Sequence, residues 1–348
     1  MTLLEKVKNN LRVDVSEALP LFDMPLCELG ELANIRLSFL ADTKKVGYIK
    51  NRMINYSNIC IAKCAFCAYH SAAKVIKPFR YSDSEILQIV DDAVLKGATQ
   101  IMLQGGLCNQ YDLEWAANLA RQIKSKYPKL DLHIFSPSEI VYFARNSNRS
   151  VFETVKTLRE AGVDSIPGAA DLLIDEIREK YSPLKPKRDE WKSVMAALAK
   201  LGLKSSATMT FGMGETLAQR IEHLNYIRTV QDELNVFNAF IAWPLAPEHT
   251  KLEHIKRASA VEFLKTVAIS RIFLDNIKNI QSGWLTEGMK VAEMALNFGA
   301  NDFGGILMDE MVIKSAGIEN TATEQGVRKM IENCGKIPFE RDGLYNEI

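Results

Sequence analysis

From Val46 onward, short runs of apolar or β-branched residues alternate with longer segments in which apolar residues recur at three-and-four spacing. The short runs are typical of strands and the longer segments of amphipathic helices. Regular alternation of the two is typical of βα units, whose strands lie parallel in one sheet. The sequence therefore predicts an α/β fold and, because eight strands are expected, a (βα)8 barrel of the TIM type. The expected strands are 46–56, 100–104, 130–135, 165–167, 205–211, 238–244, 280–284 and 300–305.

The segments on either side of this alternation are expected to be helical. Residues 1–45 carry apolar residues at helical spacing, which predicts a short N-terminal extension of helices. We expect residues 46–310 to form the barrel and 311–348 to form a C-terminal helical tail that packs on it. A length of 348 residues suits one barrel with short additions, and no obvious linker divides the barrel region.

Charge and composition narrow the class of partner. The chain contains 43 Lys and Arg against 43 Asp and Glu, so its net charge gives no general attraction for nucleic acid or an anionic membrane. No apolar run approaches the ~20 residues of a membrane span, and the first residues lack the apolar segment of a cleavable leader. We therefore expect a cytoplasmic protein that acts on a small molecule, while the oligomeric state stays open between a monomer and a homodimer.

Three cysteines, Cys60, Cys64 and Cys67, form a CxxxCxxC triplet within eight residues. Zinc sites usually take four ligands, often in paired CxxC units, and this chain has no second pair. Three thiolates suit a [4Fe-4S] cluster whose fourth iron stays open. Such an iron can chelate the amino and carboxylate groups of S-adenosylmethionine (SAM), whose sulfonium–carbon bond is then cleaved by one electron. The other cysteines lack this spacing and are expected to be ordinary thiols: Cys27, Cys108 and Cys334.

Residues directly after strands are the next candidates, because a parallel barrel places its active site where its strands end. Gly105 and Gly106 follow the second strand, where glycine permits the backbone to approach the amino group of SAM; a simple turn is the alternative. Ser136 and Glu139 follow the third strand and are candidates to bind the ribose or methionine part of SAM. Ser followed by Glu three residues later is also the pattern of a helix capping box.

Three titratable side chains are candidates for catalysis. Asp171 and Glu215 follow the fourth and fifth strands, where a carboxylate can accept a proton or bind a substrate hydroxyl; solvated loop carboxylates are the alternative. His133 lies in the third strand, and the alternation there turns it toward the barrel interior. It is expected to be either a substrate contact or a core histidine held by a hydrogen bond. Trp243 and Trp284 also have two alternative roles, since each is expected either to line a pocket or to fill the core.

Beyond these motifs, the sequence resembles the radical SAM enzymes of menaquinone and deazaflavin biosynthesis, from about Val46 to the final GKIPFERDGLY. The resemblance implies a radical SAM barrel, a [4Fe-4S] cluster on the cysteine triplet and SAM as co-substrate. It also implies that Phe66 packs on the adenine of SAM and that Gln104, with the two glycines after it, contacts SAM. The stretches that carry the resemblance are RMINYSNICIAKCAFCAY (52–69), TQIMLQGGL (99–107), HIFSPSEI (133–140), SATMTFG (206–212) and NIQSGWLTEGMKVAEMALNFGANDFGG (279–305).

Three enzyme types share this pattern: aminofutalosine synthases, cyclic dehypoxanthine futalosine synthases and the tyrosine-using subunit of deazaflavin (FO) synthase. The second type is the most similar. It implies that a 5'-deoxyadenosyl radical takes a hydrogen from the ribose part of dehypoxanthine futalosine, that the carbon radical adds to the benzoate ring, and that an electron and a proton are lost as a spiro ring closes. The residues that favour this type are Gln104 to Gly106, Ser182-Pro183 with Lys185, Trp243-Pro244 and Trp284 to Thr286.

Two strand ends depart from the family pattern. After the fourth strand the chain reads Gly-Ala-Ala-Asp (168–171), one residue shorter than the family and with Asp in place of Glu. After the fifth strand it reads Gly-Met-Gly-Glu (212–215), without the histidine that the family carries. Both departures bear on the identity of the substrate more than on the radical chemistry.

Several interpretations therefore stay open. One keeps the radical chemistry but changes the substrate, as in the sister enzymes or a divergent paralogue. A non-catalytic iron–sulfur or SAM-binding protein and a structural zinc protein are the alternatives of another class. If the chain is a radical SAM enzyme, it needs an electron donor, such as a flavodoxin or a ferredoxin, as its protein partner.

Overall fold

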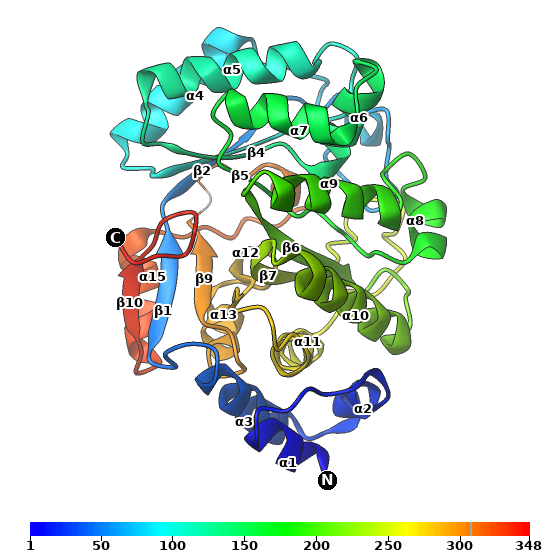
Figure 1. Ribbon diagram of the computed structural model, residues 1–348, viewed down its shortest axis with the longest axis vertical. Coiled ribbons are helices and arrows are strands. Elements are labelled where there is room, and N and C mark those ends of the chain that lie inside the picture. Colours follow the sequence, from blue (N-terminus) through cyan, green and yellow to red (C-terminus); the bar gives the residue numbers. More distant parts are fainter. Residues whose placement is uncertain (307) are drawn as a thin grey trace.

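A seven-stranded parallel sheet forms the centre of the protein. The computed structural model describes residues 1–306 and 308–348, and Figure 1 shows its ribbon. The strands follow one another in chain order from β2 to β8, as expected of consecutive βα units. Their bounds are β2 Asn51–Asn55, β3 Gln100–Gln104, β4 Asp131–Ile134, β5 Ser165–Ile166, β6 Lys204–Phe211, β7 Phe237–Pro244 and β8 Asn279–Ile280.

A smaller sheet and two single bridges bring the edges of the large sheet together. The smaller sheet has the order β10-β1-β9 and consists of β1 (Lys45–Ile49), β9 (Asp302–Gly305) and β10 (Ile337–Glu340). Gln281, directly after β8, forms a parallel bridge with Asp302, and Arg52 of β2 forms one with Met308. The strands from β2 to β9 thus follow one another around a ring, and the predicted TIM-type α/β barrel is confirmed.

Two strand predictions need correction. The run 46–56 is divided at Lys50 into β1 and β2, because its neighbour on one side changes from β10 to β3. The run 280–284 keeps only its first residue in a strand. Gly283 takes a left-handed conformation (φ 68°) and Trp284 begins a short helix, in which its indole stacks on Phe303 at 5.5 Å between ring centroids. Trp284 is therefore a core residue.

Helices cover the outside of the barrel, and two of them begin at side-chain caps. The Ser82 hydroxyl accepts a hydrogen bond from the Glu85 N–H, and the Glu85 carboxylate accepts one from the Ser82 N–H at 2.7 Å. Asp112 caps the next helix by accepting from the Trp115 N–H at 2.8 Å. The helical elements of the barrel are η2 Ser71–Ala73, α4 Asp83–Leu95, α5 Leu113–Lys126, α6 Pro137–Asn146, α7 Val151–Glu160, α8 Asp175–Tyr181, α9 Arg188–Lys200, α10 Leu217–Leu234, α11 Ala260–Phe273, α12 Trp284–Glu287 and α13 Met289–Ala295.

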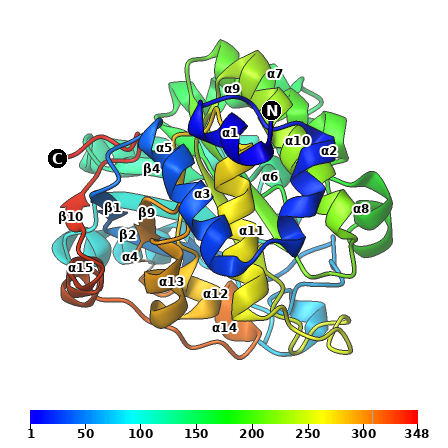
Figure 2. The same cartoon turned by 90° about the horizontal axis from the view of Figure 1, so that it is seen from below.

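The N-terminal extension is helical, as predicted, and packs on one side of the barrel. Its longest helix, α3, lies alongside α11, and Figure 2 shows the two from below. None of the described helices is long and apolar enough to cross a membrane. The elements of the extension are α1 Leu3–Lys8, α2 Val15–Ala18, η1 Leu19–Asp23 and α3 Leu26–Ser38.

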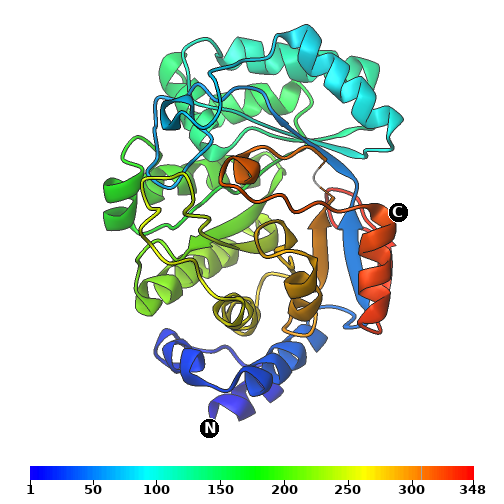
Figure 3. The same ribbon diagram turned by 180° about the vertical axis from the view of Figure 1, so that it is seen from behind.

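The C-terminal tail contains α14 (Val312–Ser315), α15 (Glu324–Asn333) and the strand β10, which the sequence analysis did not predict. β10 pairs with β1, and Figure 1 shows it at the outer edge of the smaller sheet. Seen from behind, in Figure 3, α15 lies in front of this edge. Arg341 follows β10 and forms a buried ion pair with Asp302 of β9, at 2.6 Å from Nε to Oδ2 and 2.9 Å from Nη2 to Oδ1. The tail is therefore part of the barrel wall.

Candidate active site

The cysteine triplet lies in the loop after β2 and lines a cavity of about 440 Å³ inside the barrel. Cys64 is buried, while Cys60 and Cys67 are half-buried and pack in the same small cluster with Ala62 and Leu107. The Leu107 N–H also donates a hydrogen bond to the Sγ of Cys60 at 3.3 Å. Three thiols from one loop, facing one cavity, fit the donor set that a [4Fe-4S] cluster with an open iron requires.

Burial favours the neutral form of Cys64 and Cys67 while no metal is bound. It raises the pKa of Cys64 to about 12 and raises the pKa of Cys67 above its ordinary value. Iron binding replaces the thiol proton, so cluster assembly at this loop releases protons. Within the described residues no group of three His, Cys, Asp or Glu side chains converges on a single ion. A cluster does not require convergence, because each thiolate binds a different iron.

Gly105 and Gly106 bring the end of β3 against the cluster loop. A Cβ at Gly105 would lie 2.4 Å from the Tyr56 ring, and one at Gly106 would lie 2.2 Å from the Ile59 carbonyl oxygen. The Gly106 N–H also donates to the Ser57 carbonyl at 2.9 Å. Both glycines line the cavity, but the close approach that requires glycine here is the approach to the cluster loop.

Glu139 lines the cavity and holds this contact from the α6 side. Its Oε1 accepts hydrogen bonds from the Tyr56 hydroxyl at 2.7 Å and from the Gly105 N–H at 3.1 Å. Its Oε2 accepts from the Ser136 N–H at 2.6 Å and the Ser136 hydroxyl at 2.7 Å, which completes the capping box of α6. Burial raises the pKa of Glu139, while these bonds act in the opposite direction. The carboxyl therefore positions the β3 loop and α6.

Asp171 lies on the other side of the cavity mouth, beside Lys185. The Lys185 ammonium donates a hydrogen bond to Asp171 Oδ2 at 2.6 Å. It also lies 5.7 Å from the centroid of the ring of Phe66, the residue between the second and third cysteines in the sequence. Burial lowers the pKa of Lys185, but the attraction of Asp171 outweighs it and the pKa ends above its ordinary value. Oδ1 of Asp171 has no hydrogen-bond donor within the described residues, so it is free to meet a ligand.

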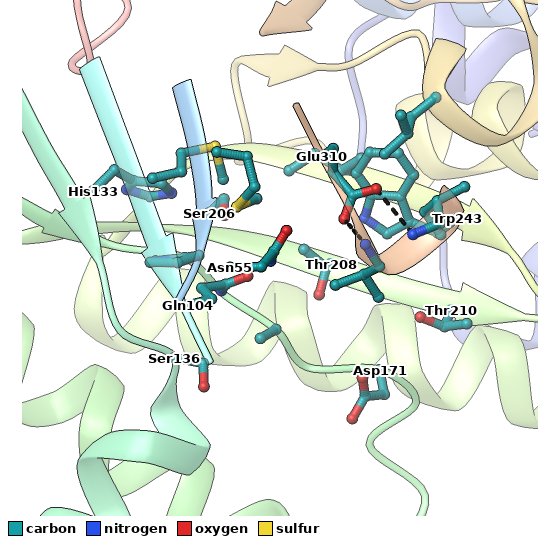
Figure 4. A pocket seen from close by; sticks show the side chains of 18 of the residues that line it. Asn55, Gln104, His133, Ser136, Asp171, Ser206, Thr208, Thr210, Trp243 and Glu310 are labelled. Atoms are coloured by element: carbon teal, nitrogen blue, oxygen red, sulfur yellow. Dashed lines mark hydrogen bonds between the residues drawn. The ribbon is translucent and has the colours of Figure 1, made fainter. Parts of the chain in front are cut away.

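His133 lies deeper in the barrel, where its Nδ1 is 2.7 Å from the Ser165 hydroxyl of the neighbouring strand. Burial, with the nearby positive charge of Arg341, lowers the pKa of His133 to about 3. The imidazole is therefore neutral near pH 7 and suited to hydrogen bonding. Figure 4 shows His133, Gln104, Ser136 and Asp171 around one pocket, and all of them line the cavity.

Glu215 is the one proposed site residue that the cavity lining does not include. Its side chain is fully buried and accepts from the Gly212 and Met213 N–H groups, each at 2.7 Å. Its Oε1 also accepts from Nε of Arg220 at 2.7 Å. These contacts hold the loop after β6, and we do not retain Glu215 as a catalytic candidate.

Sequence reasoning missed a row of hydroxyls on β6. Ser206, Thr208 and Thr210 lie two residues apart, all line the cavity, and Figure 4 shows them along one strand. The Ser206 hydroxyl accepts from the Gly168 N–H at 3.1 Å and the Thr208 hydroxyl from the Ala170 N–H at 2.8 Å. Each of these two hydroxyls keeps its own hydrogen for a ligand. Their period-two spacing in SSATMTF was the available signal.

Other residues that line the cavity carry no clear signal in the sequence that would have identified them as site residues. Glu310 follows the last barrel strand, and its carboxylate accepts from the Val312 N–H at 2.6 Å and the Ile313 N–H at 2.9 Å, as Figure 4 shows. Burial raises the pKa of Glu310. Arg341 and Tyr345 reach the cavity from the C-terminal tail. Their partners Asp302 and Gln281 lie 39 and 64 residues earlier in the sequence. Trp243 lines the cavity, so of its two expected roles, pocket lining and core packing, the first is the one observed.

Comparison with protein families agrees with this site. The model of the Radical SAM superfamily matches residues 54–227, and that of the CofH/MqnC C-terminal region matches 235–347. A cyclic dehypoxanthine futalosine synthase of Halalkalibacterium halodurans is 35% identical over 99% of this chain and 94% of its own length. One from Streptomyces coelicolor is 38% identical over 99% of this chain and 88% of its own. The 5-amino-6-(D-ribitylamino)uracil–L-tyrosine 4-hydroxyphenyl transferase of Archaeoglobus fulgidus is also 38% identical, over 90% of this chain and 91% of its own.

Solved structures share the fold at lower identity. Methylornithine synthase (PylB) superposes with a TM-score of 0.77 at 19% identity, over 97% of both chains. The hydrogenase maturase HydG of Carboxydothermus hydrogenoformans gives a TM-score of 0.77 at 14% identity, over 98% of this chain and 79% of its own. The chain belongs to the radical SAM superfamily and, within it, to the family of the cyclic dehypoxanthine futalosine synthases and the tyrosine 4-hydroxyphenyl transferases.

Proposed function

We propose that this chain converts dehypoxanthine futalosine to cyclic dehypoxanthine futalosine, a step of menaquinone biosynthesis, as a radical SAM enzyme. The observation that carries the proposal is the triplet of thiols that lines a cavity inside the barrel, in a chain 35–38% identical to two cyclic dehypoxanthine futalosine synthases over 99% of its length. When bound, the cluster and SAM supply a 5'-deoxyadenosyl radical. The residues of the chain hold these groups, enclose the substrate and handle the proton that ring closure releases.

Cys60, Cys64 and Cys67 are the proposed cluster ligands. Phe66, whose ring lies beside them in the cavity, is the proposed contact of the SAM adenine. Gln104, Gly105, Gly106 and Ser136 line the cavity at the adjoining strand ends, where they are proposed to contact the rest of SAM. Glu139 acts through Gly105 and Tyr56, because both of its oxygens already accept hydrogen bonds from protein groups.

A nucleoside-derived substrate carries hydroxyls, and the cavity offers matching groups on β6. The hydroxyl oxygens of Ser206 and Thr208 accept hydrogen bonds from loop N–H groups, so their own hydrogens are available to a ligand in the cavity. His133 is proposed as a hydrogen-bond partner of the substrate, since burial lowers its pKa to about 3 and leaves the imidazole uncharged near pH 7. Asp171 is the proposed proton acceptor, because it lines the cavity and, within the described residues, only its Oδ2 accepts a hydrogen bond, from Lys185.

The test is anaerobic reconstitution with iron and sulfide, followed by incubation with SAM, a reductant and dehypoxanthine futalosine. We expect cyclic dehypoxanthine futalosine together with 5'-deoxyadenosine and methionine. Asp171→Asn should lower product formation about 10- to 100-fold, whereas Glu215→Gln should act mainly on stability. Formation of 5'-deoxyadenosine without turnover of the substrate would contradict the proposal.

The tyrosine 4-hydroxyphenyl transferases are the second candidate, because one of them is as similar as the Streptomyces synthase, at 38% identity. As their name says, these enzymes transfer a 4-hydroxyphenyl group, with 5-amino-6-(D-ribitylamino)uracil and L-tyrosine as the two reactants. The same reconstituted enzyme, offered these two compounds in place of dehypoxanthine futalosine, decides between the candidates. We expect no coupled product, and its formation would assign the chain to the second activity.

A further inference from the structure

The positive charges of this chain are concentrated around the cluster loop. Although the chain is neutral as a whole, the segments 60–80, 180–187 and 249–257 together contain ten Lys and Arg against a single acidic residue, Glu253. Eight of these cations are exposed, and one of them, Lys187, is paired with Glu179. We name the other seven the basic rim. The basic rim consists of Lys63, Lys74, Lys77, Arg80, Lys180, Lys251 and Lys256.

Backbone contacts bring the three segments together. The Ala65 N–H donates to the Tyr181 carbonyl at 2.7 Å, and the Lys251 N–H donates to the Ala65 carbonyl at 3.0 Å. The Asn58 side chain donates to the Lys77 carbonyl at 3.1 Å, which ties the far end of the first segment to the cluster loop. The positive charges of both Lys251 and Lys63 also help to lower the pKa of His70, after the larger effect of its burial. The basic rim is therefore one surface.

Most other cations of this region are already paired, but those of the basic rim are not. Lys185 bonds Asp171, Lys187 lies 3.7 Å from Glu179 and Arg257 lies 3.4 Å from Glu287. Across the described ranges, none of the seven rim cations has an acidic side chain within ion-pair distance. Their charge is therefore available to an outside partner.

Exposed apolar side chains lie on the same segments. Ile61 is 48% exposed, Val75 41% and Leu184 53%. Ile61 and Lys63 lie between the first and second cysteines, and Leu184 precedes the lysine that stands over Phe66. A surface with apolar side chains among unpaired cations is typical of a docking site for an acidic protein, for which electrostatic steering sets the association rate.

We propose that the basic rim docks an acidic one-electron carrier protein against the cluster loop. The inference rests on the proposed function, in which the cluster must receive an electron before SAM is cleaved. In the step itself the reduced centre of the carrier loses one electron, the [4Fe-4S] cluster gains it, and no bond or proton changes. Nucleic acid and membranes fit less well, because the charge surrounds the three thiols and does not extend over the whole chain.

The test uses the reconstituted holoenzyme with a reduced, acidic bacterial flavodoxin as the probe and follows cluster reduction by stopped-flow absorbance. The double variant Lys77→Glu with Lys251→Glu reverses two exposed rim charges and spares the cysteines. We expect reduction by flavodoxin to slow about tenfold or more at low salt. We also expect the wild-type rate to fall as salt rises. Reduction by dithionite should stay within about twofold, which shows that the cluster is intact.

The matched control is Lys129→Glu, an exposed lysine that precedes β4 and so lies at the opposite end of the strands from the cluster loop. It should leave both rates unchanged. Equal flavodoxin rates in the double variant and the wild type would overturn the proposal, as would a wild-type rate that does not depend on salt. Vesicle binding lost in the double variant, with flavodoxin reduction unchanged, would assign the rim to an anionic membrane instead. If flavodoxin reduces the cluster as expected but no cyclised product forms with any reductant, the proposed function fails and the docking surface stands.

Discussion

The two ends of the barrel are held together in different ways. At the cluster end, the contacts join neighbours: the loop after β2 meets the loop after β3 through Gly105, Gly106 and Glu139. At the opposite end, the C-terminal tail closes the barrel, with Arg341 bound to Asp302 and the Tyr345 hydroxyl accepting from Gln281 at 2.8 Å. Gly343 of the tail also lies against Asp131, the first residue of β4. The proposed cluster ligands therefore lie at one end of the barrel, and the contacts by which the C-terminal tail closes the barrel lie at the other.

Loss of a cluster ligand should show the difference between the two ends most clearly, because it should abolish activity and leave the fold intact. Cys64→Ser removes one of the three thiols, so we expect iron content to fall and SAM cleavage to be lost completely. The fold should persist, because the closing contacts are elsewhere. Iron analysis, 5'-deoxyadenosine formation and thermal unfolding test this, with the exposed Cys27→Ser as the control. Full activity in Cys64→Ser would refute the assignment of the cluster loop.

Breaking the tail contact should instead act on stability. Arg341→Met leaves the buried Asp302 carboxylate without its partner, and we expect a loss of about 3–5 kcal/mol in the free energy of unfolding. Adding Asp302→Leu removes the uncompensated charge and should restore much of this loss. Urea unfolding measures both variants. Equal stability of the single variant and the wild type would show that the tail does not hold the barrel closed.

Gly105→Ala tests the cluster end by packing alone. The added methyl meets the Tyr56 ring at 2.4 Å, so we expect about 3 kcal/mol of destabilisation and weaker retention of the cluster. Gly326→Ala, within α15, should be neutral or slightly stabilising because alanine favours the helix. Unfolding and iron content are measured for both. Unchanged iron content in Gly105→Ala would show that the close approach of the two loops is not needed.

The smallest expected effect is the pH dependence from His133. Its folded-state pKa of about 3 lies below the ordinary 6.5, so the unfolded chain binds more protons and the folded state loses stability as pH falls through 6.5 toward 3. Between pH 7 and pH 5 this costs about 2 kcal/mol. His133→Gln should remove that part of the pH dependence. An identical dependence in the two proteins would mean that His133 is not buried in neutral form.

Sequence reasoning captured the features that are local in the chain. The cysteine triplet, the strand ends and the capping box of Ser136 and Glu139 each depend on residues within a few positions of one another. It did not capture the division of the run 46–56, because that depends on β10, which comes from the tail. Nor did it separate Glu215 from Asp171. Both follow strands, and only packing shows that the Glu215 carboxylate turns back onto its own loop while Asp171 lines the cavity.

The central claim is that the three thiols hold a cluster with one iron open to SAM inside this cavity. The most direct measurement is electron paramagnetic resonance of the reduced, reconstituted enzyme, with iron analysis, before and after SAM is added. The account predicts about four iron per chain and a spectrum that changes when SAM binds. A spectrum that SAM leaves unchanged, or a protein that binds zinc in place of iron, would contradict it.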